Sequence, residues 1–227
     1  SYSCKNALDT SFKDKTITAK QNEFAIIIHG GAGTILKENL SEEKENAYKL
    51  KLEEAIRTGY GILKGGGTSQ EAVVKTIQVM EESPLFNAGK GAVFTHEETN
   101  ELDASFMDGK TLNAGAVAGV MNVKSPIELA VKIMTDSEHV MLSGKGASIF
   151  AKEKGLEIVA PSYFYTERRF NSLQNIKNKE KTGAVSDNKK VAFYDADIKN
   201  SKFGTVGCVA LDKDGNNKRL KASLIAS

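Results

Sequence analysis

The sequence predicts one sizeable domain in which α-helices and β-strands alternate. Its 227 residues are enough for a single domain with its own hydrophobic core. Short β-prone runs, bounded by glycine-rich turns, alternate with segments whose apolar residues recur at helical spacing. The longest clean apolar run, FAIII at 24–28, is far shorter than the roughly 18 residues of a membrane-spanning helix, so we expect a buried strand there.

The first part of the chain predicts one strand and two helices. The strand at 24–28 runs into a glycine-rich turn, HGGAG, at 29–33. A helix is expected over 41–63, because Ser41 can cap it and glutamates occupy its first turn. The sequence TSQE at 68–71 is a capping-box pattern that opens a second helix.

The pattern changes after a loop at 82–94. Two β-prone runs within 102–123 are joined by the Asp-Gly pair at 108–109, which is a strong hairpin signal. A third helix is expected over 125–134, with Ser125 as its cap and proline at its first helical position.

A fourth helix around 147–154 precedes the least regular part of the chain. Residues 168–202 are rich in Asn, Lys and Asp without a sustained apolar period, and they predict a mobile linker. The run TVGCVAL at 205–211 has the composition of a buried strand, and the Asp-Gly pair at 214–215 would turn the chain into a partner strand.

The first residue of that strand, Thr205, directly follows Gly204. If the bond between them is cut, Thr205 gains a free α-amine beside its own hydroxyl, and the amine can act as the base that the hydroxyl lacks. The same hydroxyl can make the cut by attacking the carbonyl of Gly204, where glycine tolerates strained backbone. A strand that merely begins with threonine after glycine is the alternative.

The composition argues against several classes of function. Lys and Arg number 31 against 29 for Asp and Glu, so a small molecule or peptide fits better as a partner than nucleic acid does. The spacing of His29, His96 and His139 is not that of metal ligands, and Cys4 and Cys208 are too far apart in sequence to indicate a zinc site or a disulfide framework.

The start of the chain, SYSCKN, is similar to the end of a bacterial lipoprotein signal peptide. That similarity implies a lipid anchor at Cys4 and a periplasmic, membrane-anchored location. A polar tail with an incidental cysteine, on a cytoplasmic protein, is the alternative.

Seven blocks of sequence occur in a characteristic order between residues 24 and 216. They are FAIIIHGGAG, SPLFNAGKGAVFT, ELDASFMDG, AGAVAGV, ELAVKIM, HVMLSGKGA and GTVGCVALDKDGN. Their order and spacing resemble the plant-type asparaginase/isoaspartyl peptidase family of N-terminal nucleophile hydrolases. The resemblance implies an α+β fold, a four-layer αββα sandwich, and a precursor that cleaves itself before its catalytic threonine. It also implies hydrolysis of L-asparagine and β-aspartyl dipeptides, no organic cofactor, and a homodimer of processed αβ units.

The resemblance assigns roles to particular positions. Thr205 matches the catalytic nucleophile, and Gly204 matches the residue left at the end of the α chain. Asn87 matches an asparagine that supports the active-site hydrogen bonds, while Gly30 and Gly31 match a turn where backbone approaches closely. Main-chain carbonyls of one loop would hold a sodium ion, at Met80, Glu81, Ser83, Phe86, Ala88 and Lys90. Each of these positions also has a plain interpretation as a turn or loop residue.

The sequence departs from the family pattern after the final block. The position that matches a second active-site threonine is Ser223, and the matches for the oxyanion hole and for the groups that grip the substrate are missing. One oxyanion donor alone is worth roughly 10²- to 10³-fold in rate. We therefore expect an incomplete sandwich and a truncated precursor with weak or no activity. Its expected parts are a polar tether (1–22), an α-chain body (23–167), a mobile linker (168–204) and the start of a β chain (205–227).

Three alternatives stay open from the sequence. A non-catalytic fragment could serve as a binding or decoy module for a full-length paralogue. The hydrolase could be closer to glycosylasparaginases, which act on glycosylated asparagine. The HGGAG turn could cradle a phosphate, although it lacks the Lys-Ser/Thr of a P-loop.

Overall fold

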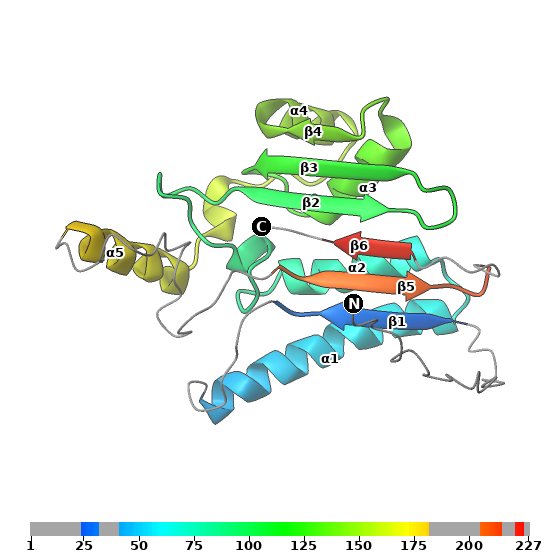
Figure 1. Cartoon of the computed structure of the whole chain (residues 1–227), viewed down its shortest axis with the longest axis horizontal. Helices are drawn as coiled ribbons and strands as arrows, with labels where there is room; N and C mark the ends of the chain where they lie inside the picture. The colour runs from blue at the N-terminus through cyan, green and yellow to red at the C-terminus, as the bar shows by residue number, and fades with distance from the viewer. Residues whose placement is uncertain (1–23, 32–40, 182–204, 215–220, 225–227) are drawn as a thin grey trace, which may run out of the picture.

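The structure is a computed structural model that describes residues 24–31, 41–181, 205–214 and, for the backbone alone, 221–224. Its strands are β1 Ala25–His29, β2 Leu102–Met107, β3 Ala114–Val120, β4 Met141–Ser143, β5 Gly207–Leu211 and β6 Lys221–Leu224. They form one six-stranded sheet in the order β1-β5-β6-β2-β3-β4 (Figure 1). With the helices that pack on it, the sheet makes the domain an α+β fold.

The helices begin largely where the sequence predicts. They are α1 Glu42–Lys64, α2 Ser69–Glu81, α3 Pro126–Asp136, α4 Gly144–Glu153 and α5 Glu167–Lys181, with short 3₁₀ turns η2 Gly89–Gly91 and η3 Pro161–Phe164. The side chain of Ser41 accepts a hydrogen bond from Lys44 N at 3.2 Å, and that of Thr68 accepts one from Glu71 N at 3.1 Å. Both predicted caps are therefore confirmed. None of the described helices is long and apolar enough to cross a membrane.

The sheet joins the two ends of the chain. β5 pairs antiparallel with β1, so that His29 lies opposite Gly207 and Ala25 lies opposite Leu211. β6 lies between β5 and β2 and is antiparallel to both. The predicted β2–β3 hairpin is confirmed, with Asp108 accepting hydrogen bonds from Thr111 in the connecting loop. The pairing places the strand that begins near Thr205 beside the first strand of the sheet.

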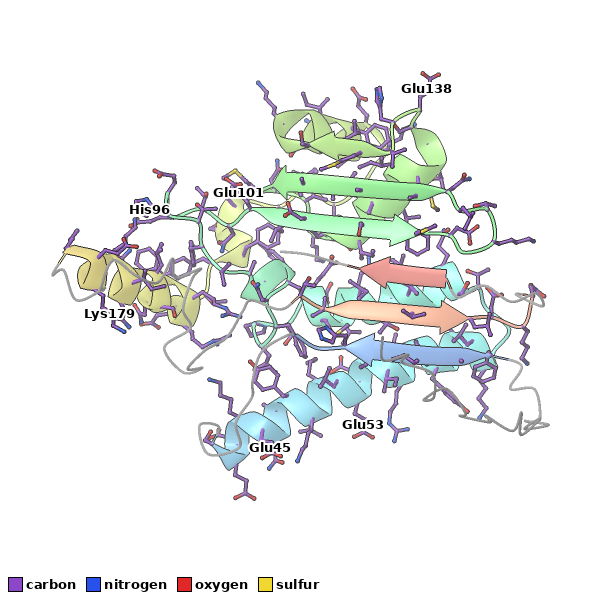
Figure 2. The ribbon with its side chains drawn as sticks, viewed as in Figure 1. Glu45, Glu53, His96, Glu101, Glu138 and Lys179 are labelled. Carbon is purple, nitrogen blue, oxygen red and sulfur yellow. The ribbon has the colours of Figure 1, made fainter. Side chains whose placement is uncertain are left out.

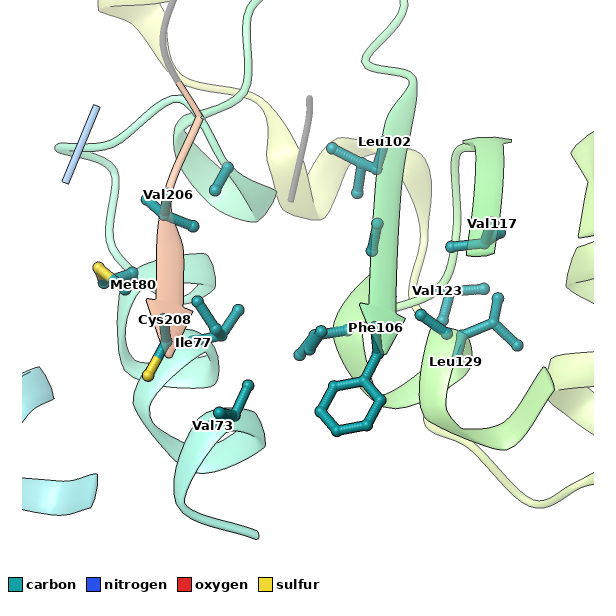
Figure 3. Close-up of a cluster of buried hydrophobic side chains, with 14 of the residues drawn as sticks. Val73, Ile77, Met80, Leu102, Phe106, Val117, Val123, Leu129, Val206 and Cys208 are labelled. Atoms are coloured by element: carbon teal, nitrogen blue, oxygen red, sulfur yellow. The ribbon is translucent and has the colours of Figure 1, made fainter. Parts of the chain in front are cut away.

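The hydrophobic core lies between one face of the sheet and the helices. Figure 3 shows side chains from β5 and the residue before it approaching those of α2, with the side chains of β2, β3 and α3 in the other half of the same core. The labelled side chains are Val73, Ile77, Met80, Leu102, Phe106, Val117, Val123, Leu129, Val206 and Cys208. All are at most 1% exposed, so α2 and α3 are held to the sheet by burial of apolar surface.

The opposite face of the sheet is open within the described residues. Alternate residues of β1 are exposed, and Ile27 is 66% exposed. Ala25 and Ile27 lie opposite Leu211 and Val209, so that apolar residues of two paired strands share this face. Figure 1 shows α1, α2 and α3 on the other side.

One part of the predicted linker is wrong. Residues 168–181 belong to α5, in which Arg169 and Leu173 are buried four positions apart, on one face of the helix. Phe170 packs against Phe94 and Tyr165, and Arg168, Gln174 and Lys177 make polar contacts. The segment therefore carries little of the apolar period by which helices are recognised. Residues 182–204, the rest of the predicted linker, lie outside the described residues, as does Gly204.

Two glycines of α1 test how closely the helices pack. A Cβ at Gly59 would overlap the Thr76 hydroxyl and the Ile26 side chain, whereas a Cβ at Gly61 meets nothing within 4 Å. We expect Gly59→Ala to lower the free energy of unfolding by about 1–3 kcal/mol. Gly61→Ala in the same helix should raise it by about 0.5–1 kcal/mol. Urea denaturation measures both, and changes of the same sign would contradict the packing of α1 on β1 and α2.

Candidate active site at the start of β5

Thr205 lies two residues before β5, where the chain enters the sheet. Its carbonyl oxygen is 2.9 Å from Nδ1 of His29, the last residue of β1. Because a carbonyl oxygen can only accept, Nδ1 must carry the proton of this hydrogen bond. The hydroxyl oxygen of Thr205 is buried and has no hydrogen-bond partner among the described residues. Buried polar groups without a partner are uncommon, so this hydroxyl marks a candidate site.

The glycine turn after β1 connects Thr205 to a second segment. A Cβ at Gly30 would lie 2.8 Å from Cδ2 of Leu52 and 3.3 Å from the ring of Phe86. Gly31 has φ +141°, a backbone conformation that favours glycine. The turn therefore packs against α1 and against the loop that leads to Asn87.

Asn87 is buried in that loop, which we call the Asn87 loop and define as residues 82–94. Its side-chain oxygen accepts a hydrogen bond from Val93 N at 3.0 Å, and this bond joins the two legs of the loop. The Asn87 loop leaves α2 and passes through η2 at the end of the sheet where β1 ends and β5 begins (Figure 1). The structure thus brings the segments of Thr205, Gly30 and Asn87 to the same end of the sheet.

Backbone oxygens crowd the inside of this loop. A Cβ at Gly89, where φ is +50°, would overlap the carbonyl oxygen of Glu81, and a Cβ at Gly91 would overlap that of Phe86. The carbonyls of Met80 and Ala88 accept hydrogen bonds from Ser83 N at 3.2 Å and Gly91 N at 3.1 Å. Each carbonyl oxygen has a second lone pair.

Ligands for a hard cation are oxygens, and backbone carbonyls supply them without any charged side chain. Among the described residues, no group of three or more His, Cys, Asp and Glu side chains could hold a metal ion. The backbone of the loop offers oxygen atoms as its only candidate ligands.

The side chain of Glu81 has a role that the sequence did not indicate. It is 2% exposed, and its two carboxylate oxygens accept hydrogen bonds from the Ser125 hydroxyl at 2.7 Å and from Ile127 N at 3.0 Å. Ser125 is the N-cap residue of α3, as predicted, but its side chain makes no capping hydrogen bond, because its hydroxyl donates to Glu81. The carboxylate of Glu81 instead accepts the hydrogen bond from Ile127 N in the first turn of α3. Burial raises the pKa of Glu81 to about 7, against the lowering effect of these two hydrogen bonds.

A second remote carboxylate fixes the far end of β5. Asp212, just after β5, is buried and accepts a hydrogen bond from Ser69 N, in the first turn of α2, at 2.7 Å. An acidic side chain at a helix N-terminus also interacts favourably with the helix dipole. No sequence pattern assigned this role to Asp212.

Other reactive groups do not contribute a nucleophile here. Burial raises the pKa of the Cys208 thiol to about 12, so it stays protonated and unreactive at neutral pH. His96 and Glu101 lie on the segment leading into β2, and their side chains point towards the outside of the molecule (Figure 2). Among the described groups near the start of β5, the hydroxyl of Thr205 is the best placed to act as a nucleophile.

Comparison with known proteins supports the family resemblance that the seven sequence blocks indicated. A family model described as asparaginase matches residues 22–217. The chain is 42% identical over 212 residues to a putative isoaspartyl peptidase/L-asparaginase of Dictyostelium discoideum and 43% identical over 196 residues to an isoaspartyl peptidase of Escherichia coli. It is 41% identical over 192 residues to a plant-type L-asparaginase of Pyrobaculum calidifontis. The chain belongs to the plant-type asparaginase/isoaspartyl peptidase family.

The matches cover most of this chain but a smaller part of each relative. Each of the three alignments covers 84% of this chain and 58–61% of the relative. The chain therefore spans about three fifths of the length of these relatives.

Glu81 predicts a pH dependence of stability. Its pKa is about 7 in the folded chain and about 4.5 in the unfolded one, so the folded state binds more protons between these values. The wild-type chain should therefore lose stability relative to Glu81→Gln as the pH rises from 4.5 to 7, by up to ~3 kcal/mol. Urea denaturation of both proteins across this range measures the difference, and a difference independent of pH would contradict the buried carboxylate.

Proposed function

We propose that this chain carries the nucleophile half of an autoprocessing threonine hydrolase. Its substrates would be the side-chain amide of L-asparagine and the β-aspartyl bond of isoaspartyl dipeptides. The observation that carries the proposal is the buried hydroxyl of Thr205, which has no described partner at the start of β5 and follows Gly204 in sequence. The names of the relatives, isoaspartyl peptidase and L-asparaginase, support this choice of substrates.

The proposed chemistry begins with self-cleavage. The Thr205 hydroxyl attacks the carbonyl carbon of Gly204, the peptide bond shifts to an ester, and water hydrolyses the ester. Gly204 keeps the new carboxylate, and Thr205 keeps the new α-amine. The hydrogen bond from His29 to the Thr205 carbonyl fixes the peptide unit that follows the nucleophile, which limits its rotation in both steps.

Substrate hydrolysis then uses the same residue twice. The α-amine of Thr205 takes the proton of its hydroxyl as the hydroxyl attacks the side-chain carbonyl of the substrate. Ammonia leaves from asparagine, or an amino acid leaves from a β-aspartyl dipeptide, and an ester to Thr205 remains. Water hydrolyses this ester and releases aspartate.

The open face of the sheet bears on how the domain is assembled. We propose that the open face of the sheet is one inner face of a four-layer αββα sandwich, because exposed apolar residues of paired strands rarely face solvent over a broad area. The homodimer, the lipid anchor at Cys4 and the periplasmic location stay predictions, and Cys4 lies outside the described residues.

Three alternatives compete with this function. A phosphate at the glycine turn is disfavoured, because α1 begins only at Glu42 and its first turn is acidic. A non-catalytic binding module and a glycosylasparaginase-like activity stay open, and turnover on the three kinds of substrate distinguishes them from asparaginase.

Substitutions at Thr205 and at nearby Cys208 test which residue is the nucleophile. Thr205→Ala should abolish self-cleavage and lower turnover of L-asparagine and of a β-aspartyl dipeptide by at least about 10³-fold. Thr205→Ser keeps a hydroxyl and should retain part of both activities. Cys208→Ala, three residues further along in β5, should stay within about twofold of wild type because the thiol is protonated. Ammonia release and intact mass measure the outcome. Equal turnover by Thr205→Ala and wild type would refute the proposal, and a wild-type chain whose intact mass shows no cleavage before Thr205 would favour the binding module.

We propose that the carbonyls at Met80, Glu81, Ser83, Phe86, Ala88 and Lys90 hold a sodium ion. The ion would supply a positive charge that neutralises converging backbone oxygens, and so keep the loop closed. Replacing NaCl by choline chloride at equal ionic strength should then lower the melting temperature. If 0.1 M sodium is 100 times the dissociation constant, the loss is about 2.7 kcal/mol. Identical melting temperatures in the two salts would count against the site.

A further inference from the structure

Two consecutive arginines at the start of α5 hold the Asn87 loop. Nε of Arg169 donates a hydrogen bond to the carbonyl of Gly91 at 2.8 Å. Nη2 of Arg168 donates to the carbonyl of Pro84 at 3.2 Å and is 3.5 Å from that of Leu85. The two side chains therefore reach the two legs of the loop, on either side of Asn87.

The loop depends on such donors because most of its backbone lies outside helices and strands, where carbonyl groups have no regular hydrogen-bond donor. Between the end of α2 and the start of β2, the single 3₁₀ turn η2 satisfies only a few carbonyls. Buried carbonyls without donors are costly, so side chains from remote elements fill the role. Tyr48 of α1 supplies a further donor, from its hydroxyl to the carbonyl of Leu85 at 2.7 Å.

Arg169 contributes a buried charged donor. It is 7% exposed, although arginine is among the residues that are almost never fully buried without partners. Its bond is made at Gly91, where the loop closes so tightly that a Cβ would overlap the carbonyl of Phe86. A charged donor makes a stronger and more directional hydrogen bond than a neutral one. The guanidinium therefore acts at the point where a small shift would open the loop.

We propose that Arg168 and Arg169 are positioning residues for the active site. By fixing both legs of the Asn87 loop, they hold the loop against the glycine turn that contacts it through Phe86 and Gly30. The helix α5, which precedes the proposed cleavage site in sequence, thereby also shapes the proposed active site. The effect on catalysis rests on the proposed function, whereas the effect on the loop does not.

Hydrogen–deuterium exchange of the full chain tests the proposal. We expect Arg169→Met to speed exchange in peptides from 82–94 by at least about 10-fold, while peptides from β2 and β3 keep the wild-type rate. Arg169→Lys keeps the charge and one donor group, and should give an intermediate rate. Arg168→Met should affect mainly the leg around Pro84. The matched control is Arg57→Met, because Arg57 pairs with Glu53 on the exposed side of α1.

Measurements of kcat and KM distinguish the positioning role of the arginines from the proposed hydrolase function. In a wild-type chain that turns over, Arg169→Met should lower kcat by at least about 10-fold with KM nearly unchanged, and Arg169→Lys should partly restore kcat. If the wild-type chain neither cleaves itself nor turns over, the proposed function fails, and loop exchange still decides the role of the arginines. Loop exchange in Arg169→Met that equals Arg57→Met, or faster exchange spread equally over β2 and β3, would overturn the positioning role.

Discussion

The pairing of β5 with β1 is the constraint on which the candidate site depends. It joins strands from opposite ends of the described chain and sets His29 opposite Gly207, which brings the imidazole to the carbonyl of Thr205. Asp212 fixes the other end of β5 by capping α2. A strand can slip by one residue only if every side chain changes face, and Cys208 and Ala210 are buried against the helices. The core therefore sets the register, and the register places Thr205 beside His29.

The second part of the candidate site is the Asn87 loop, which is anchored by the buried side chains of Glu81 and Arg169. Glu81 ties the start of the Asn87 loop to α3, and Arg169 ties its end to α5. Burying either side chain in its charged form costs solvation, and hydrogen bonds offset part of that cost: with Gly91 O for Arg169, and with the Ser125 hydroxyl and Ile127 N for Glu81. Phe86 and Phe94 pack the loop into the core, and the polar anchors hold the backbone between and beside them. Polar residues far from Thr205 in sequence thus contact both ends of a loop that lies at the same end of the sheet as Thr205.

Sequence patterns predicted the elements that depend on interactions between residues close together in the chain. The caps at Ser41 and Thr68, the β2–β3 hairpin and the strand after Thr205 all follow from short-range rules, and the structure contains them. The family resemblance added Asn87 and the glycine turn, which no spacing rule could assign. The contacts made by Glu81, Asp212 and Arg169 span many residues and involve polar groups, so neither period nor propensity reveals them. The helix α5 was missed for the same reason.

The most direct test of this account is a disulfide trap for the β1–β5 register. Ile28 lies opposite Cys208, and opposed residues in antiparallel strands are close enough for a disulfide. In a Cys4→Ser background, Ile28→Cys refolded under oxidising conditions, before burial protects the Cys208 thiol, should form a disulfide with Cys208, seen as the loss of both free thiols, whereas Ile27→Cys should keep both. A disulfide from Ile27→Cys and none from Ile28→Cys would show a register shifted by one residue, with Thr205 no longer beside His29.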